Sequence, residues 1–128
     1  MKSTAPGGPR QSRKGRTAMT NEAAIEKEIQ DKGLTAPRLT PQLIDDAIAC
    51  EYTGRASDLF SQAPMVEAMK CLTICVLVLK NGFTIVGKSA CASPENFNAE
   101  LGNKIAREDA RRQIWALEGY ALRNKLAA

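Results

Sequence analysis

The pattern of apolar and polar positions is most informative between Cys71 and Cys91. Two runs rich in β-branched residues flank Asn81-Gly82 there, and this dipeptide is the strongest short-range signal for a β-hairpin. A two-residue turn predicts that Val78 lies opposite Ile85. Both faces of the first run are apolar, and a hairpin alone is only marginally stable in water. We therefore expect the chain's own helices, or another copy of the chain, to cover it.

Helices are predicted on both sides of this hairpin. Thr40 is a suitable N-cap and Pro41 fits the first helical turn, so a helix should run from about Thr40 to Tyr52. Ser93-Pro94 repeats this signal before a long helix that should run from about Pro94 toward Asn124. The predicted fold class is α+β: helix, antiparallel β-hairpin and long C-terminal helix. Two helices cannot cover both hairpin faces and both edges, so we expect oligomerisation to complete the sheet.

The N-terminal segment has a different composition from the rest. Residues 1–19 hold five basic residues and no acid, while the whole chain carries a net charge of +4, which leaves −1 elsewhere. The segment lacks apolar periodicity and the apolar core of a secretory signal. We predict a disordered basic arm at residues 1–19 and a single α+β domain at residues 20–128. A short polar helix from Asn21 to Lys32, ending at Gly33, or a frayed extension of the arm would follow.

Four cysteines and the absence of histidine limit the chemistry. No CxxC pair occurs, so zinc sites of the common Cys/His types are not expected. Three of the cysteines lie in the apolar hairpin, where a free thiol behaves as a small hydrophobic group. The longest apolar run is too short to cross a bilayer. We interpret the chain as a reduced, cytosolic protein with no metal and no cofactor.

One motif match points to a nucleotide-hydrolysing enzyme, but its context does not. Gly82 to Ser89, GFTIVGKS, fits the phosphate-loop pattern letter for letter. A phosphate loop has flexible residues between its glycines and opens directly into a helix, whereas Phe-Thr-Ile-Val predicts a strand. Without histidine, a Ser or Cys nucleophile also lacks its usual general base. We therefore expect no enzymatic activity and no catalytic residue.

The arginines outside the arm are candidates for anion binding. Arg55, Arg107, Arg111 and Arg112 form the main cluster, and arginine suits planar bidentate contact with phosphate. Ion pairing within the helix, for example Glu108 with Arg112, is the structural alternative. Arg107 and Arg111 lie one turn apart with like charge, on a face that we expect to be partly exposed, and a bound anion would offset their repulsion. Both interpretations remain open from the residues alone.

A family resemblance extends this picture. The stretch SACASPENF, followed by IAREDARRQIWALEGY and preceded by TPQLIDDAIA, resembles a family of small phage-encoded proteins over about Thr40 to Leu126. That family includes the first class of Thoeris anti-defence proteins. They are sponges that bind cyclic ADP-ribose isomers, made by a bacterial TIR-domain enzyme, without degrading them. Similar members bind cyclic oligonucleotide signals, and they assemble as hexamers built from dimers. The basic arm departs from this family pattern.

The resemblance also implies which residues bind the ligand. Arginines would meet phosphates, an aromatic ring would stack on the base and an asparagine would hydrogen-bond it, in a pocket between subunits. Carried onto this sequence, the ligand-binding residues are Arg55, Phe83, Asn96, Arg107 and Arg111. The implied partner is a cyclic ADP-ribose isomer or cyclic oligonucleotide in the host cytoplasm, held by a homo-oligomer. A nucleic-acid-associated phage protein that uses its basic arm is the alternative of a different class.

Overall fold

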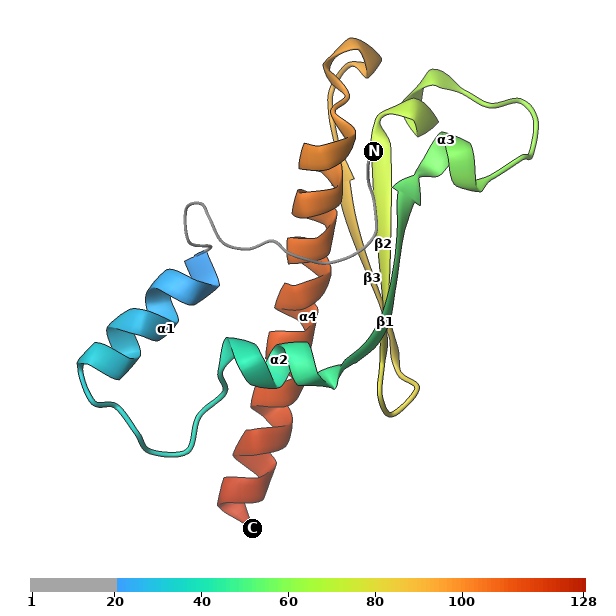
Figure 1. Ribbon diagram of the computed structural model, residues 1–128. Coiled ribbons are helices and arrows are strands. Elements are labelled where there is room, and N and C mark those ends of the chain that lie inside the picture. The colour runs from blue at the N-terminus through green and yellow to red at the C-terminus, as the bar shows by residue number, and fades with distance from the viewer. Residues whose placement is uncertain (1–20) are drawn as a thin grey trace. The chain divides into compact units, whose positions relative to one another are not determined.

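The computed structural model describes residues 21–128 and has the α+β composition that the sequence predicts (Figure 1). The elements are α1 (Asn21–Asp31), α2 (Pro41–Ala47), β1 (Ile48–Arg55), α3 (Ala56–Leu59), η1 (Glu67–Lys70), β2 (Leu72–Leu79), β3 (Thr84–Ala90), η2 (Pro94–Asn96) and α4 (Ala99–Ala127). The three strands form one antiparallel sheet in the order β1-β2-β3. The predicted arm at residues 1–19 lies outside the described residues.

Helix α1 belongs to a unit that precedes Arg38, whereas the sheet and the other helices form a second unit. The prediction of a short polar helix is confirmed, and no residue of α1 is buried. Its surface carries salt bridges between side chains one turn apart, such as Lys27 to Asp31 at 3.1 Å. Gly33 ends the helix with a φ of +68°, which glycine adopts without strain.

The predicted helix from Thr40 to Tyr52 begins correctly but is wrong in its second half. The Thr40 hydroxyl accepts a hydrogen bond from the Leu43 N–H at 3.2 Å, and Pro41 occupies the first turn. The helix nevertheless ends at Ala47, and the chain continues as strand β1. Pairing with β2 outweighs the helical periodicity of this short segment, because the residues from Cys50 to Arg55 all find partners along β2. The third strand of the sheet therefore comes from the same chain.

The hairpin is confirmed, but its register differs from the prediction by one residue. Leu77, not Val78, lies opposite Ile85. The Leu79 N–H bonds to the Phe83 carbonyl at 2.8 Å, which leaves a three-residue loop, and Gly82 has a φ of +90°. This is the second common hairpin turn, a tight turn followed by a left-handed residue. The shifted register puts Leu77 and Ile85 on one buried face, which the two-residue turn would not have done.

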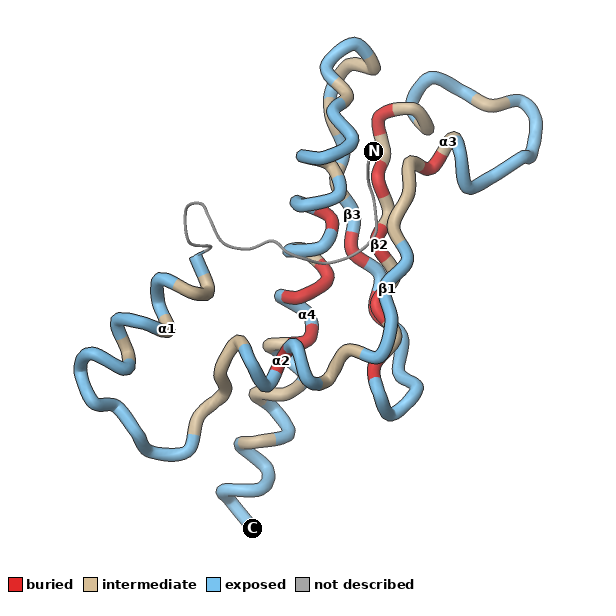
Figure 2. Tube along the Cα trace, in the orientation of Figure 1, coloured by how far each residue is buried: buried red, intermediate tan, exposed pale blue. Residues whose placement is uncertain are grey.

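The core lies between α4 and one face of strands β2 and β3 (Figure 2). Cys75, Leu77 and Ile85 pack there against a stripe of small and branched residues on the helix, namely Ala106, Ala110 and Ile114. Gly87 allows this close approach, because a Cβ at that position would overlap the Ala106 carbonyl. Gly87 is the second glycine of the phosphate-loop match. The segment around it is a strand, as predicted, and its glycine serves packing.

The long C-terminal helix is confirmed, although it begins later than predicted. Pro94 starts a single 3₁₀ turn, and α4 itself begins at Ala99. The Asn98 side chain is the N-cap, since it accepts a hydrogen bond from the Leu101 N–H at 2.9 Å. Among residues 21–128, no helix is both long and apolar enough to span a bilayer.

Candidate functional site

Arg55 is the last residue of β1, and two contacts hold its guanidinium in place. Its Nε donates a hydrogen bond to the Lys70 carbonyl at 2.6 Å. Its Cζ lies 3.8 Å from the centroid of the Phe97 ring, in cation–π stacking distance. Within the described part of the chain, its two Nη groups make no hydrogen bond. Arg55 therefore presents a fixed, planar pair of donors.

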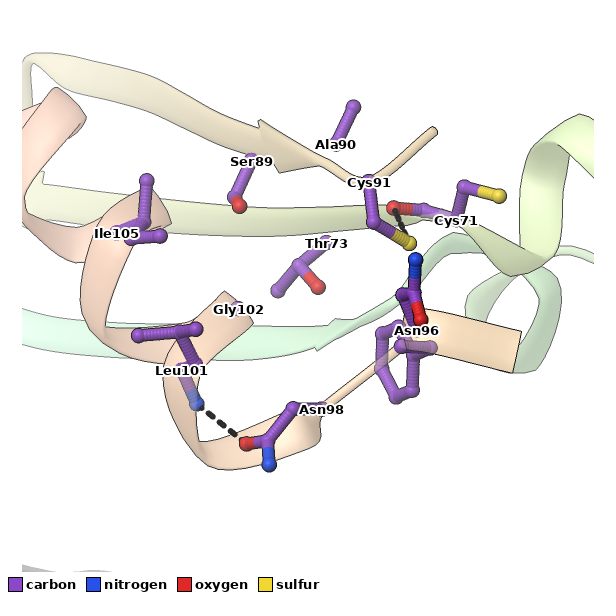
Figure 3. Close-up of a pocket in the computed structure, with 11 residues that line it drawn as sticks. Cys71, Thr73, Ser89, Ala90, Cys91, Asn96, Asn98, Leu101, Gly102 and Ile105 are labelled. Carbon is purple, nitrogen blue, oxygen red and sulfur yellow. Dashed lines mark hydrogen bonds between the residues drawn. The ribbon is translucent and has the colours of Figure 1, made fainter. Parts of the chain in front are cut away.

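A small pocket lies between the start of β2, the end of β3 and the start of α4 (Figure 3). Phe97, the ring on which Arg55 stacks, is one of its lining residues. Phe97 and Asn96 line it together with Thr73 and Ser89, which are opposite each other in the sheet. Its volume is about 100 Å³. Pockets that enclose a drug-sized ligand measure roughly 300–1,000 Å³. One chain alone therefore offers room for part of a nucleotide, such as an edge of its base.

Two cysteines, Cys71 and Cys91, line the pocket. Burial raises the pKa of the Cys71 thiol, and its hydrogen bond with Cys91 adds to the effect. The Cys91 thiol donates to the Ser93 carbonyl at 3.2 Å. A raised pKa keeps the Cys71 thiol protonated at neutral pH, and the thiol form is a poor nucleophile. All four cysteines are free thiols.

Arg107 and Arg111 share one flank of α4, and each pairs with a carboxylate from the N-terminal part of the unit. Arg107 Nε lies 2.8 Å from Glu51 Oε1, and 45% of the arginine side chain is exposed. Arg111 Nη1 lies 2.6 Å from Asp45 Oδ1, and only 7% of this side chain is exposed. The sequence interpretation placed both arginines on a partly exposed face. For Arg111 that is wrong, because its side chain is buried where it meets Asp45 of α2.

The predicted intrahelical ion pairs also differ from those in the structure. Arg112 bonds to Asp109 at 3.0 Å, three residues earlier, and not to Glu108. The carboxylates of Arg107 and Arg111 come from β1 and α2, respectively. Both carboxylates lie inside the stretch predicted as one helix, so no local signal indicated that they would reach α4.

Phe83 is separated from the other predicted ligand-binding residues. It lies at the turn of the hairpin, whereas Asn96 and Arg55 lie near the opposite end of the strands (Figure 1). Strand β2 has eight residues, which span about 25 Å at the usual rise. The structure thus brings Arg55 and Asn96 together around Phe97, but one chain cannot join Phe83 to them in a small-molecule site.

Sequence reasoning missed the role of Phe97 as the stacking partner of Arg55. It also missed two residues on the other flank of α4. Asp109 accepts a hydrogen bond from the Lys88 N–H at 2.9 Å, and Gln113 donates to the Val86 carbonyl at 2.7 Å. Their spacing of four residues on one helix face was visible in the sequence, but their target, the edge of β3, was not.

The fold and this site define a small α+β protein in which one long helix covers a three-stranded antiparallel sheet. Residues 39–126 match the model of the Phage protein (N4 Gp49/phage Sf6 gene 66) family, and because this is most of the chain, the protein belongs to that family. The comparisons with curated proteins and with solved structures gave no match.

Proposed function

We propose that this phage protein binds a cyclic ADP-ribose-type immune signal in the host cytoplasm and sequesters it without degrading it. Cyclic oligonucleotide signals are the related ligand class. The proposal is supported by membership of the phage family and by the residues that resemble the first class of Thoeris anti-defence proteins. Sequestration needs tight binding only, so it requires no catalytic group.

The observation that carries the proposal is the way in which the Arg55 guanidinium is held. Its guanidinium is held by stacking on Phe97 and by the bond to the Lys70 carbonyl, and both Nη groups remain available. A preorganised guanidinium loses little conformational entropy on binding, and its two parallel donors match the oxygens of a phosphate. A cyclic ADP-ribose signal carries a diphosphate, which is the anion this arrangement suits.

The groups next to Arg55 suit the rest of a nucleotide. The Asn96 amide makes no side-chain hydrogen bond within the described residues, and it borders the same pocket as Phe97. An amide can donate to and accept from the edge of a base. Arg107 lies on the same side of the sheet as Arg55, because its partner Glu51 is four residues before Arg55 on β1.

The site as proposed needs more than one chain. The pocket of one chain holds about 100 Å³, and Phe83 lies at the far end of the hairpin. An assembly in which a second copy supplies the missing volume and the missing aromatic contact would account for both observations. We therefore propose a homo-oligomer, a dimer or a hexamer built from dimers, with ligand sites between subunits.

Calorimetric titration of the full chain with a panel of cyclic ADP-ribose isomers and cyclic oligonucleotides tests the function. We expect stoichiometric binding of one ligand class. Ligand recovered after denaturation should be chemically unchanged by chromatography and mass spectrometry. If no member of the panel binds, or if the recovered ligand has been converted to product, the proposal is wrong.

Arg55 provides the residue-level test. Arg55→Ala should weaken binding by about 10- to 100-fold, because a charge-assisted hydrogen bond contributes roughly 1.5–3 kcal/mol. Arg55→Lys should restore little, since lysine offers a point charge and no fork. Arg123→Ala is the matched control, because Arg123 is an exposed arginine near the other end of α4. Thermal melts of each variant separate lost affinity from lost structure.

The alternative function, association with nucleic acid through the basic arm, predicts a different titration. Binding would then be sequence-independent and would weaken steeply as salt increases. Deletion of residues 1–17 would abolish it. A sponge should keep its small-molecule affinity after the same deletion.

A further inference from the structure

The outer edge of β3 is closed by side chains of α4. The Lys88 N–H and the Val86 carbonyl point away from β2, and they bond to Asp109 and Gln113, respectively. A further strand could pair with β3 only by displacing these two side chains. Natural sheets often protect an edge in this way, because unpaired backbone groups attract other strands.

The pattern of hydrogen bonds shows which backbone groups of β1 face outward. In the hairpin, the Leu79 N–H bonds to Phe83, whereas the next N–H, that of Lys80, bonds to the Ala47 carbonyl just before β1. Alternate residues of an antiparallel strand bond to opposite neighbours. Odd-numbered residues of β2 therefore bond to β3, and even-numbered residues bond to β1.

This alternation leaves the outer edge of β1 open. Tyr52 is the partner of Val76 and bonds inward, so the N–H and C=O groups of its neighbours Glu51 and Thr53 point outward. In the part of the chain that the structure describes, no hydrogen bond to these outward backbone groups occurs. Strand β1 is eight residues long and contains neither Pro nor Lys, the residues with which edges are commonly protected.

We propose that a second copy of the chain pairs with this edge, β1 antiparallel to β1, about a two-fold axis at Thr53. The two three-stranded sheets then form one continuous six-stranded sheet. An isologous pairing of this kind uses the same surface on both copies, which is how most homodimers form. The closed edge of β3 leaves β1 as the edge at which the sheet can be extended.

The charged residues of β1 favour one register for this pairing. With the axis at Thr53, Glu51 of one copy lies opposite Arg55 of the partner subunit on each side of the axis. Opposite charges directly across a strand pair are stabilising, and like charges are destabilising. An axis at Glu51 would place two carboxylates against each other. An axis at Tyr52 would place Glu51 opposite Thr53. Neither Glu51 nor Arg55 would then face an oppositely charged residue across the strand pair.

The same register covers exposed apolar side chains on the other face of the sheet. Tyr52 is 63% exposed and would lie opposite Gly54 of the partner subunit. The Leu59 side chain packs against Gly54 and is 53% exposed. The aromatic ring of Tyr52 would therefore lie beside the partner subunit's Leu59, the apolar side chain that packs against Gly54.

The pairing also gives the proposed ligand site its second half, and this step rests on the proposed function. Within one chain, Glu51 and its partner Arg107 lie about 13 Å along β1 from Arg55, at the usual rise per residue. Across the axis, Glu51 of the partner subunit would lie about 5.5 Å from Arg55, the Cα spacing of a hydrogen-bonded pair. Arg107 of the partner subunit would then reach the same anion as Arg55.

Amide hydrogen exchange on the unmodified full chain tests the pairing. The Glu51 and Thr53 amides should exchange at least about tenfold more slowly when light scattering shows a dimer or a multiple of it than after dilution to monomer. A monomeric protein at micromolar concentration would overturn the proposal. So would an oligomer in which these two amides exchange as fast as those of an open edge, or protection that persists in the monomer.

Thr53→Pro provides a variant test. Proline removes one outward N–H and no bond to β2, and edge strands tolerate it when that N–H faces outward. We expect a folded monomer. Thr53→Val is the control, because it loses the hydroxyl but keeps the N–H and should still pair. A folded Thr53→Pro chain that dimerises as wild type does would overturn the pairing; if it fails to fold, amide exchange on the wild type decides.

Mixed assemblies test the shared site separately. Arg55→Ala and Arg107→Ala chains should each bind poorly alone. In a co-expressed mixture, one site of every mixed dimer holds both arginines, so about a quarter of the wild-type sites should return. If ligand binding does not return in the mixture, the two arginines of a site belong to the same chain. If the wild type binds no ligand at all, the proposed function fails, while the amide-exchange result for the pairing stands.

Discussion

Arg107 and Arg111 lie one turn apart on the same flank of α4, and each forms an ion pair, but their environments differ. Arg111 is 7% exposed against a half-exposed Asp45, whereas Arg107 is 45% exposed against Glu51. Burial makes the charge of Arg111 part of the fold, because a buried charge depends on its partner. Exposure leaves Arg107 accessible to solvent, and under the proposed function it would exchange its carboxylate for a ligand phosphate. Sequence spacing alone could not distinguish them.

The largest effect is expected from Asp45→Ala. This change removes the carboxylate against a buried guanidinium, and breaking a fully buried pair costs roughly 3–5 kcal/mol. Asp45 is 53% exposed, so water can compensate in part, and we expect a loss of about 2 kcal/mol. The melting temperature should fall by roughly 10 °C. Asp46→Ala, an exposed neighbour on α2, is the control. Equal melting temperatures for the two variants would remove the distinction between the arginines.

Arg111→Met tests whether the buried position needs a charge or only volume. Methionine keeps an unbranched apolar stem, and replacing a buried ion with a hydrophobic group of similar size is often neutral. We expect the melting temperature to stay within about 5 °C of wild type, and Arg111→Ala to be clearly less stable because it leaves a gap. Ligand affinity measured on the folded Arg111→Met chain tests the ligand role that the resemblance implies for Arg111. A tenfold loss of affinity at unchanged stability would show that Arg111 binds the ligand as well.

The comparison also shows how far the sequence could predict this molecule. Local signals were sufficient for the cap at Thr40, the strands on both sides of Asn81-Gly82 and the existence of α4. Local signals were insufficient at Ile48. Its apolar side chain fits both the helical stripe that continues from α2 and the alternating pattern of β1. Pairing with β2 decided between them, and that contact is not local.

The candidate site shows the same division between what local signals predict and what depends on non-local contacts. Residue type indicated Arg55 as an anion-binding candidate and the family resemblance implied Asn96, and the structure places both next to Phe97. Asp45 and Glu51 lie inside the stretch predicted as one helix, and nothing near them in sequence indicates α4 as the partner of their carboxylates. Hairpin register was also beyond local inference, since Asn81-Gly82 is compatible with two-residue and three-residue loops.

Arg107→Ala should show the opposite behaviour to Asp45→Ala. An exposed ion pair contributes about 0.2–1 kcal/mol, so the melting temperature should change by no more than a few degrees. Affinity for a cyclic diphosphate ligand should fall by about 10- to 100-fold, through the loss of one charge-assisted contact. Arg112→Ala is the control, an exposed arginine on another face of the same helix. A large loss of stability with unchanged affinity would make Arg107 structural.

The smallest expected effect concerns Glu51, which would compete with the proposed ligand for Arg107. Glu51→Gln keeps the size of the side chain and its hydrogen-bonding capacity but removes the negative charge 2.8 Å from the guanidinium. If Arg107 exchanges its carboxylate for a phosphate on binding, the variant should bind a cyclic diphosphate up to about tenfold more tightly, because a weaker partner is displaced. Stability should change by less than about 1 kcal/mol.

Glu108→Gln is the matched control for this change, since it removes the same charge from an exposed position next to Arg107. Both variants should be titrated at a protein concentration at which light scattering shows the wild-type assembly, because Glu51 also takes part in the proposed pairing of β1. A shared increase in affinity would reflect net charge alone. An increase confined to Glu51→Gln would locate the competition at Arg107, and a loss of affinity would mean that Glu51 positions this arginine for the ligand.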